Sequence, residues 1–294
     1  MELIDLHTHT TASDGSLQPA ELVRAAAAAG LKALAVTDHD TIDGLAEALA
    51  AQPAEGLEVV AGVEISVQGG PTGSMHMLGL LVDHTHAGLV EGLERLKRAR
   101  AERNPKIVEK FNQLGISMTM AEVEAFAGGE LVGRPHFAQV LLKRGIVRDR
   151  GEAFARYLGN GAPAYVSKFR FSPAEGMSMI LAAGGVPVLA HPGMLKLSEP
   201  DLERLVRELM QNGLQGIEAF YSEHDQPTRR ALASLAGRLG LVISGGTDFH
   251  GQPKPDIRLG VGKGDLRVPP SVLAGLKQRR EVMLAPRREA LPCS

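Results

Sequence analysis

Short apolar runs alternate with amphipathic helical patterns along most of the chain. The apolar runs lie at residues 3–6, 31–36, 57–63, 75–82, 186–190, 216–220 and 241–244, with a last one at 281–284. Helical patterns separate most of them, for example at 201–211, at 227–239, and between Pro19 and Gly30. Proline in a first turn and glycine just past a last turn are helix start and stop signals. The alternation predicts an α/β protein built on a parallel sheet or barrel.

One stretch departs from this alternation. From about Leu89 to Ala164 the pattern is helical and predicts no strand, so we expect a helical insertion. Residues 100–170 carry 12 Lys and Arg against 7 Asp and Glu, whereas the whole chain has a formal charge of −2. Such a basic segment could bind an anion, although basic residues scattered over the surface would give the same excess of positive charge.

Composition narrows the class of protein. A chain of 294 residues with 44% hydrophobic residues can fill a substantial core. No segment approaches the roughly 20 consecutive apolar residues of a membrane span, and no basic stretch precedes an apolar run at Met1, so we expect a cytoplasmic protein. The single cysteine, Cys293, offers neither an intramolecular disulfide nor a thiolate cluster for zinc, so a metal would be bound by imidazole and carboxylate.

Histidines and carboxylates gather at the predicted strands. Six of the ten histidines lie within or just after an apolar run: His7, His9, His39, His76, His191 and His250. Asp14, Glu64 and Asp248 accompany them. In β/α barrels the C-terminal ends of the strands form the active-site face. The members of each of the pairs at 7 and 9 and at 248 and 250 are two positions apart, so each pair points to one side of an extended segment and can chelate one ion.

This ligand set predicts a metal centre. Imidazole and carboxylate without sulfur suit manganese, iron or zinc, and nine ligands exceed what one ion can use. We therefore predict two or three divalent ions, with Mn²⁺ as the expected ion and Fe²⁺ or Zn²⁺ as alternatives. Two such ions can lower the pKa of a shared water to about 7 and place a hydroxide in line with a phosphorus atom, so that no protein nucleophile is required.

Each of these residues also has a structural alternative. A single histidine at a strand end is more often hydrogen-bonded structure than ligand, and Asp14 could cap the following helix. Asp38 and Asp40 flank His39, and either could orient an imidazole, as metal-bound histidines commonly require. Convergence of all nine residues at one place would decide between the two interpretations.

Six motifs resemble those of the PHP (polymerase and histidinol phosphatase) family in their usual order: residues 7–9, 14–16, 37–40, 62–66, 189–192 and 246–250. The resemblance implies a distorted seven-stranded, TIM-like barrel. It also implies three metal sites, formed by His7, His9 and Asp248, by His76 and His191, and by Asp14, His39 and His250, with Glu64 bridging the first two. All nine positions hold the residue that the family pattern requires.

Motifs in the predicted helical insertion resemble those of one subgroup of this family. Residues 133–138, 157–161 and 164–166 are similar to the stand-alone bacterial PHP phosphoesterases known as TrpH-like. That similarity implies removal of the 3′-phosphate from nucleoside 3′,5′-bisphosphates, such as adenosine 3′,5′-bisphosphate, and 5′-to-3′ trimming of short 5′-phosphorylated RNA. We expect a barrel at residues 1–98 and 166–294, a helical lid at 99–165, and a nucleotide or short single-stranded oligonucleotide as partner. No obligate protein partner is indicated.

Several residues are candidates for substrate contacts. Arg134 and His136 would lie on the lid, where a guanidinium could bind a phosphate with two hydrogen bonds. The structural alternatives are a surface ion pair for Arg134 and a hydrogen bond at a helix start for His136. Lys168, Arg170 and Tyr221 are further candidates for substrate binding.

Three residues are candidates for catalysis. Glu64 and Asp248 would act through the metal ions. His224 follows a predicted strand end and could protonate the leaving oxygen.

Two other functions stay open. One is a small-metabolite phosphatase of the histidinol-phosphatase type, against which the basic insertion argues modestly. The other is a non-catalytic module that binds metal or nucleic acid. A sequence pI near 6.6 and 4% aromatic residues disfavour nucleic-acid binding without catalysis.

Overall fold

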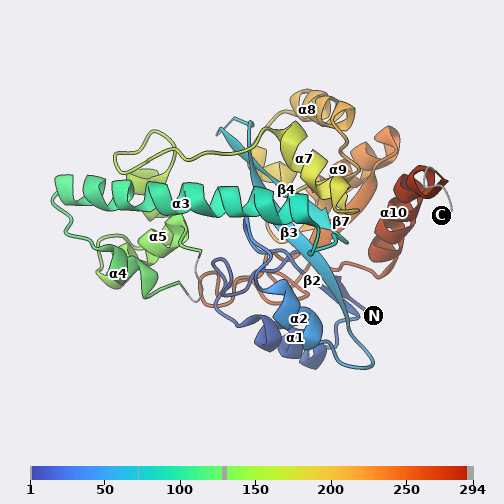
Figure 1. Ribbon diagram of the computed structural model, residues 1–294, viewed down its shortest axis with the longest axis horizontal. Helices are drawn as coiled ribbons and strands as arrows, with labels where there is room; N and C mark the ends of the chain where they lie inside the picture. Colours follow the sequence, from blue (N-terminus) through green and yellow to red (C-terminus); the bar gives the residue numbers. More distant parts are fainter. Residues whose placement is uncertain (1, 72, 128–130, 290–294) are drawn as a thin grey trace.

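A seven-stranded sheet rolled into a nearly closed barrel forms the centre of the molecule (Figure 1). The computed structural model describes residues 2–71, 73–127 and 131–289. The strands are β1 (Ile4–Asp5), β2 (Ala33–Val36), β3 (Glu58–Gln68), β4 (Ser74–Leu80), β5 (Val186–Leu189), β6 (Gly216–Tyr221) and β7 (Val242–Gly246), and they are neighbours in this order. The Leu6 N–H donates to the Gly245 carbonyl at 3.1 Å and so joins the two edges. The predicted distorted barrel of seven strands is confirmed.

The sheet departs from the predicted parallel arrangement at β4. This strand pairs antiparallel with both β3 and β5, whereas the other neighbours are parallel. β3 ends at Gln68 and β4 begins at Ser74, and a connection this short cannot hold the crossover of a dozen or more residues that parallel strands need. Gly69 and Gly70, with φ of 113° and 66°, adopt backbone conformations that other residues avoid.

The last predicted strand, residues 281–284, is also wrong. These residues belong to helix α10 (Ser271–Glu289), and Val282 is 64% exposed. The three apolar residues that follow Glu281 fit a strand or a helix equally well, so periodicity alone could not assign them. The helix is anchored instead by its first turns, where Leu273 and Leu276 are buried against the strands at the barrel's edges.

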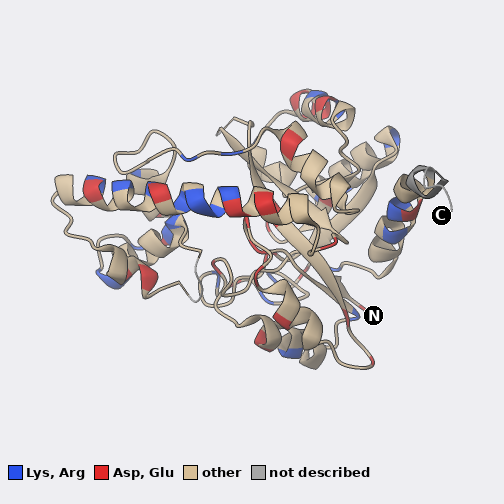
Figure 2. Ribbon diagram, viewed as in Figure 1, with Lys and Arg blue, Asp and Glu red and all other residues tan. Residues whose placement is uncertain are grey.

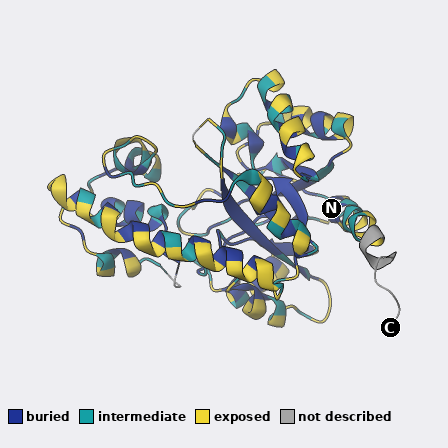
Figure 3. Ribbon diagram, turned by 45° about the horizontal axis from the view of Figure 1, so that its top comes forward, coloured by how far each residue is buried: buried dark blue, intermediate teal, exposed yellow. Residues whose placement is uncertain are grey.

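Helices cover the outside of the barrel. α1 (Pro19–Ala28) and α2 (Leu45–Ala50) pack on β2 and β3, while α7 (Pro173–Ala182), α8 (Glu199–Gln211) and α9 (Gln226–Leu239) cover the strands from β3 to β7. The helices predicted at 201–211 and 227–239 are therefore confirmed as α8 and α9. Figure 3 shows the strands as mostly buried and the helices as exposed on their outer faces. None of the described helices combines the length and the apolar character that crossing a bilayer requires.

A long helix, α3 (Ala87–Gln113), extends from the barrel to a group of short helices (Figure 1). These are α4 (Met120–Glu124), α5 (Arg134–Lys143), α6 (Arg150–Ala153) and the π-helical turn η1 (Phe154–Leu158). The described part of residues 89–164 holds no strand, as predicted. Leu93 and Leu96 of α3 pack in the barrel core, whereas Ile107 and Phe111 pack in a second core with α5. The predicted boundary at residue 99 falls between these two sets, inside one continuous helix, and the division into two domains stays a prediction.

Asp5 connects the first strand to the residues that follow the last one. Its carboxylate accepts hydrogen bonds from the Thr247 N–H at 2.8 Å, the Thr247 hydroxyl at 2.6 Å and the Gly260 N–H at 2.9 Å. The side chain is fully buried. These bonds fix the backbone just before Asp248.

Replacing Asp5 with asparagine is expected to lower the free energy of unfolding by about 1–3 kcal/mol. An amide can accept at one oxygen only, so at least one buried donor at Thr247 or Gly260 loses its acceptor. Urea unfolding at pH 7 measures the effect, with the exposed Asp256→Asn as the matched control. An unchanged free energy in Asp5→Asn would contradict the structural role given to this carboxylate.

Candidate metal centre

All nine predicted ligand residues converge at one mouth of the barrel. His7 and His9 follow β1, Asp14 lies in the loop after them, His39 follows β2, Glu64 lies in β3 and His76 in β4, His191 follows β5, and Asp248 and His250 follow β7. The parallel strands bring their C-terminal ends to the same edge, which is why residues 243 positions apart in the sequence become neighbours.

Glu64 lies at the centre of this cluster. Its Oε1 is 2.9 Å from His76 Nδ1 and 3.0 Å from His191 Nε2, and its Oε2 is 2.9 Å from His39 Nδ1 and 3.3 Å from His9 Nε2. Burial would raise the pKa of this carboxyl, but the surrounding histidines, His39 and His76 foremost, hold it well below its usual range. Glu64 is therefore ionised, and each of its oxygens faces imidazole nitrogens.

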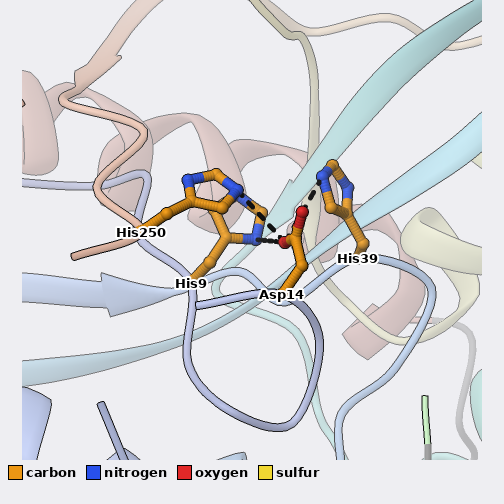
Figure 4. A group of neighbouring side chains, drawn as sticks. All are labelled: His9, Asp14, His39 and His250. Carbon is orange, nitrogen blue, oxygen red and sulfur yellow. Dashed lines mark ion pairs between the residues drawn. The ribbon is translucent and has the colours of Figure 1, made fainter. Parts of the chain in front are cut away.

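Three overlapping groups have the spacing of metal ligands. Figure 4 shows the first, in which Asp14 Oδ1 lies 3.1 Å from His250 Nε2 and 3.9 Å from both His9 Nδ1 and His39 Nε2. The second group comprises His7, His9 and Asp248, and the third comprises His39, Glu64 and His76. Within each group the ligand atoms lie within 4.8 Å of one another.

Buried atoms without hydrogen-bond partners mark the same place. Among the described residues, five atoms of this cluster lack such a partner: His7 Nε2, His9 Nε2, Asp14 Oδ1, His39 Nδ1 and Glu64 Oε2. A buried polar atom without a partner is costly, and native proteins rarely keep several together. Burial would lower the pKa of His9, but Asp248 and Glu64 raise it to about 9, which reflects the negative charge around its ring. The donor set and its geometry fit divalent cations.

Glu218, which the sequence analysis missed, orients two of the histidines. Its Oε1 lies 2.8 Å from His7 Nδ1, and its Oε2 accepts a hydrogen bond from the His191 N–H at 2.7 Å. His250 Nδ1 lies 2.8 Å from the Asp248 carbonyl oxygen, to which it can donate. Occupying Nδ1 in this way leaves Nε2 of His7 and His250 facing the cluster, the arrangement that holds metal-bound imidazoles in place. Glu218 lies in β6, within the apolar run at 216–220, so a charged residue inside a predicted strand was the signal in the sequence.

Neither Asp38 nor Asp40 bonds an imidazole directly, but the Ser13 hydroxyl, which donates to Asp38 at 2.5 Å, lies 3.4 Å from His9 Nδ1. Asp38 accepts hydrogen bonds from the N–H and hydroxyl of Thr10 at 2.8 and 2.7 Å, and so fixes the loop between β1 and α1. Asp40 pairs with Arg100 and with Lys168. Asp40 has φ of 55°, in the left-handed region.

Two further site residues have left-handed backbone. His191 has φ of 31° and Asp248 has φ of 57°. Such conformations are unfavourable for residues other than glycine and are retained mainly where function or surrounding contacts require them. Each lies two positions after a strand end, His191 after β5 and Asp248 after β7, and each side chain reaches the cluster.

A basic cleft of about 210 Å³ adjoins the cluster. Asp14, His39, His76 and His250 form one wall. Seven basic residues line the rest: Arg100, Arg103, Arg134, Arg150, Lys168, Arg170 and Lys254. Arg134, Lys168 and Arg170 were predicted from the sequence, and three of the others lie in the basic segment at 100–170. Figure 2 shows the basic residues along the middle of α3, which supplies Arg100 and Arg103.

Nearby carboxylates neutralise only some of the basic residues in this cleft. Asp40 accepts from Arg100 and lies 3.1 Å from Lys168 Nζ, whereas no described carboxylate pairs with Arg103, Arg134 or Arg170. Burial lowers the pKa of Lys168 to about 7, and burial with the nearby Arg170 lowers that of Arg134 to about 10. A bound anion would stabilise these buried cations, which repel one another. The electrostatics of the cleft therefore favour anion binding.

Three residues that were predicted to bind substrate or to transfer a proton make hydrogen bonds within the protein. His136 Nδ1 accepts from the Gly133 N–H at 3.0 Å, which is the helix-start alternative to substrate binding. The Tyr221 hydroxyl donates to Asp248 Oδ2 at 2.9 Å. His224 is buried, with Nδ1 3.1 Å from the Ala219 carbonyl and Nε2 accepting from the Gly193 N–H at 3.1 Å. Both nitrogens of His224 are therefore engaged with the backbone, and none is free for the predicted proton transfer.

Comparisons with known proteins agree with this geometry. The family model for the PHP domain matches residues 5–144. A 3′,5′-nucleoside bisphosphate phosphatase from Chromobacterium violaceum is 37% identical over 258 residues, which are 85% of this chain and 88% of that protein. A 5′-3′ exoribonuclease from Haemophilus influenzae is 38% identical over 84% of this chain and 89% of that protein. A solved structure of an amidohydrolase from Chromobacterium violaceum, with bound sulfate and no metal, has a TM-score of 0.85 and 35% identity and covers 94% of this chain and 96% of that one.

Proposed function

We propose that this chain, which belongs to the PHP domain family, is a metal-dependent phosphoesterase that acts on 5′-phosphorylated nucleotides. Its reaction is hydrolysis of the 3′-phosphate of nucleoside 3′,5′-bisphosphates, such as adenosine 3′,5′-bisphosphate, with 5′-to-3′ trimming of short 5′-phosphorylated RNA as the same bond cleavage on a longer substrate. The observation that carries the proposal is the basic cleft beside the cluster of histidines and carboxylates. The named activities of two relatives support it.

The nine converging residues would hold two or three divalent ions. His7, His9 and Asp248 would form one site, His76 and His191 a second, and Asp14, His39 and His250 a third, with Glu64 shared at the centre. Imidazole and carboxylate ligands suit Mn²⁺, and also Fe²⁺ or Zn²⁺. Bound there, these ions would polarise the phosphoryl oxygens and lower the pKa of a water molecule to about 7.

The chain's own residues would orient the ligands and neutralise charge. Glu218 fixes His7 and His191, and the Asp248 carbonyl fixes His250. Lys254 Nζ lies 2.6 Å from Asp248 Oδ2, where its charge can stabilise the negative charge that develops on the phosphoryl group. Glu64 and Asp248 would act in catalysis as carboxylate ligands of the metal ions. His224 would hold the backbone at Ala219 and Gly193 in place through its two ring nitrogens.

The basic cleft would select substrates with a second phosphate. Arg103, Arg134 and Arg170, with Arg100 and Lys168, would surround the 5′-phosphate while the 3′-phosphate lies at the cluster. Guanidinium groups match the geometry of a phosphate with paired hydrogen bonds. Arg134 comes from the helical insertion, so residues 99–165 would act as the lid that completes this subsite. The sulfate held by a solved relative is an anion of the same tetrahedral shape.

A substrate comparison tests this function against the metabolite alternative. With Mn²⁺-loaded protein, phosphate release from adenosine 3′,5′-bisphosphate should exceed release from 3′-AMP and from histidinol phosphate by at least about tenfold in kcat/KM, because a charge-assisted hydrogen bond contributes about 1.5–3 kcal/mol. A short 5′-phosphorylated RNA should be shortened from its 5′ end in the same assay. Preference for histidinol phosphate would move the function to a metabolite phosphatase.

A further inference from the structure

A second hollow, which we call the outer groove, lies beside the basic cleft. It has a volume of about 1070 Å³, against about 210 Å³ for the cleft. Its walls come from the loop between β1 and α1, from the residues just after α4, from α5, from the start of α6, and from the segments after β6 and β7. In Figure 1 the segment after β7, in orange, lies beside the green helices of the insertion. The groove thus follows the seam between the barrel and the insertion.

Two basic residues connect the outer groove to the cleft. Arg150 and Lys254 line both hollows. Arg150 donates to the Pro253 carbonyl at 3.1 Å, and its Nη2 lies 3.8 Å from Asp14 Oδ2. Lys254 lies beside Asp248. Both cations therefore border the histidine and carboxylate cluster on the side where the groove begins.

The chemistry of an oligonucleotide requires a second exit from the cluster. The phosphate to be cleaved is bonded to O3′ of the first nucleoside and to O5′ of the second. Hydrolysis forms a bond between the water oxygen and phosphorus, breaks the bond from phosphorus to O3′, and returns a proton to O3′, so the phosphate stays with the second nucleoside. If the first nucleoside and its 5′-phosphate fill the basic cleft, the second nucleoside must leave the cluster in another direction.

We propose that the outer groove binds the nucleotide on the 3′ side of the cleaved phosphate, and that Arg150 and Lys254 guide the RNA chain from the cluster into it. This inference rests on the proposed function and extends it to the oligonucleotide substrate. The groove is a subsite that nucleoside bisphosphates do not use, because their 3′-phosphate carries no further nucleoside.

The lining of the outer groove suits a nucleotide. Phe126 is half-buried against the core of the insertion, with Lys143 Nζ 5.4 Å from its ring centroid, and it lines the groove, where the ring can stack on a base for about 1–3 kcal/mol. Gln139 and Gln252 supply amides that can bond to a base or a ribose hydroxyl. The acidic residues of the wall are compensated: Asp149 Oδ1 accepts from the Glu152 N–H at 2.8 Å, and Glu223 and Asp256 lie within 4.0 Å of Lys263 Nζ.

Two groove variants test this assignment by comparing two substrates. Phe126→Leu keeps an apolar side chain but removes the ring, and Gln139→Glu adds a negative charge. Each should lower kcat/KM for a 5′-phosphorylated tetra-adenylate by about tenfold, while kcat/KM for adenosine 3′,5′-bisphosphate stays within about twofold. Gln211→Glu, on α8 outside the barrel, is the matched charge control and should change neither value. The groove variants should also weaken binding of a 3′-labelled tetra-adenylate with a phosphorothioate at the first linkage, measured by fluorescence anisotropy.

The outcomes separate the two proposals. If the unmodified protein hydrolyses the bisphosphate but not the tetra-adenylate, or if the groove variants change both substrates alike or neither, the groove assignment is overturned and the proposed phosphatase stands. If the unmodified protein hydrolyses neither substrate, the proposed function itself fails. Selective loss on the tetra-adenylate with a silent control supports the groove.

Discussion

Replacing Asp248 with asparagine is expected to reduce kcat for adenosine 3′,5′-bisphosphate at least about a hundredfold. Asp248 Oδ1 lies 3.2 Å from His9 Nε2 and 3.6 Å from His7 Nε2, so its negative charge belongs to the ligand group that these residues form. An amide supplies no such charge, and the group would bind a divalent ion more weakly. His9→Ala should have an effect at least as large, because His9 belongs to two of the three groups. Steady-state phosphate release measures both.

The control for these variants separates chemistry from folding. Asp201→Asn, on the exposed surface of α8, makes the same chemical change outside the centre and should retain full turnover. Thermal unfolding of each variant checks that the barrel is intact. Near-normal kcat in a folded Asp248→Asn or His9→Ala protein would remove these residues from the metal centre.

The second large effect is expected at Arg170. Arg170→Ala should lower kcat/KM for adenosine 3′,5′-bisphosphate by about ten- to a hundredfold, because the substrate's 5′-phosphate loses a charge-assisted hydrogen bond in a buried site. The value for 3′-AMP, which has no 5′-phosphate, should change by less than about threefold. The ratio of the two kcat/KM values would then measure how strongly the cleft selects for a 5′-phosphate.

Arg207→Ala provides the matched control for the cleft. Arg207 is exposed on α8 and pairs with Glu203, so its removal should leave both constants unchanged. An equal loss on both substrates in Arg170→Ala would show that this arginine supports the cluster itself and does not discriminate by the 5′-phosphate.

The metal centre could be predicted from sequence because strand ends meet at one place. Apolar runs locate the strands, and a side chain just after a parallel strand reaches the barrel mouth whatever the rest of the fold does. That is why His39 and His191 could be named without a structure. The partners of Asp38 and Asp40 could not be predicted in this way, since the direction of a side chain in a turn depends on φ values, such as 55° at Asp40, that the pattern does not contain.

The basic cleft was predictable only in part. Arg134 and Lys168 stood out by motif and spacing, but Arg100 and Arg103 lie within a helix where any residue could face solvent, and only packing shows that both are buried. Lys254 comes from a loop whose course is set by contacts with the insertion, such as the bond from Arg150 to Pro253. The hydrogen bond from the Gly133 N–H to His136 Nδ1 at its own helix start likewise could not be chosen from the sequence over a substrate contact.

Metal content and activity measured on the same protein test the central claim most directly. The chain would be stripped with a chelator, reloaded stepwise with Mn²⁺, and assayed for bound metal by elemental analysis and for phosphate release from adenosine 3′,5′-bisphosphate. The account predicts no phosphate release from the stripped protein and a return of activity as two or three ions bind per chain. Full activity in the stripped protein, or metal binding that restores none, would contradict it.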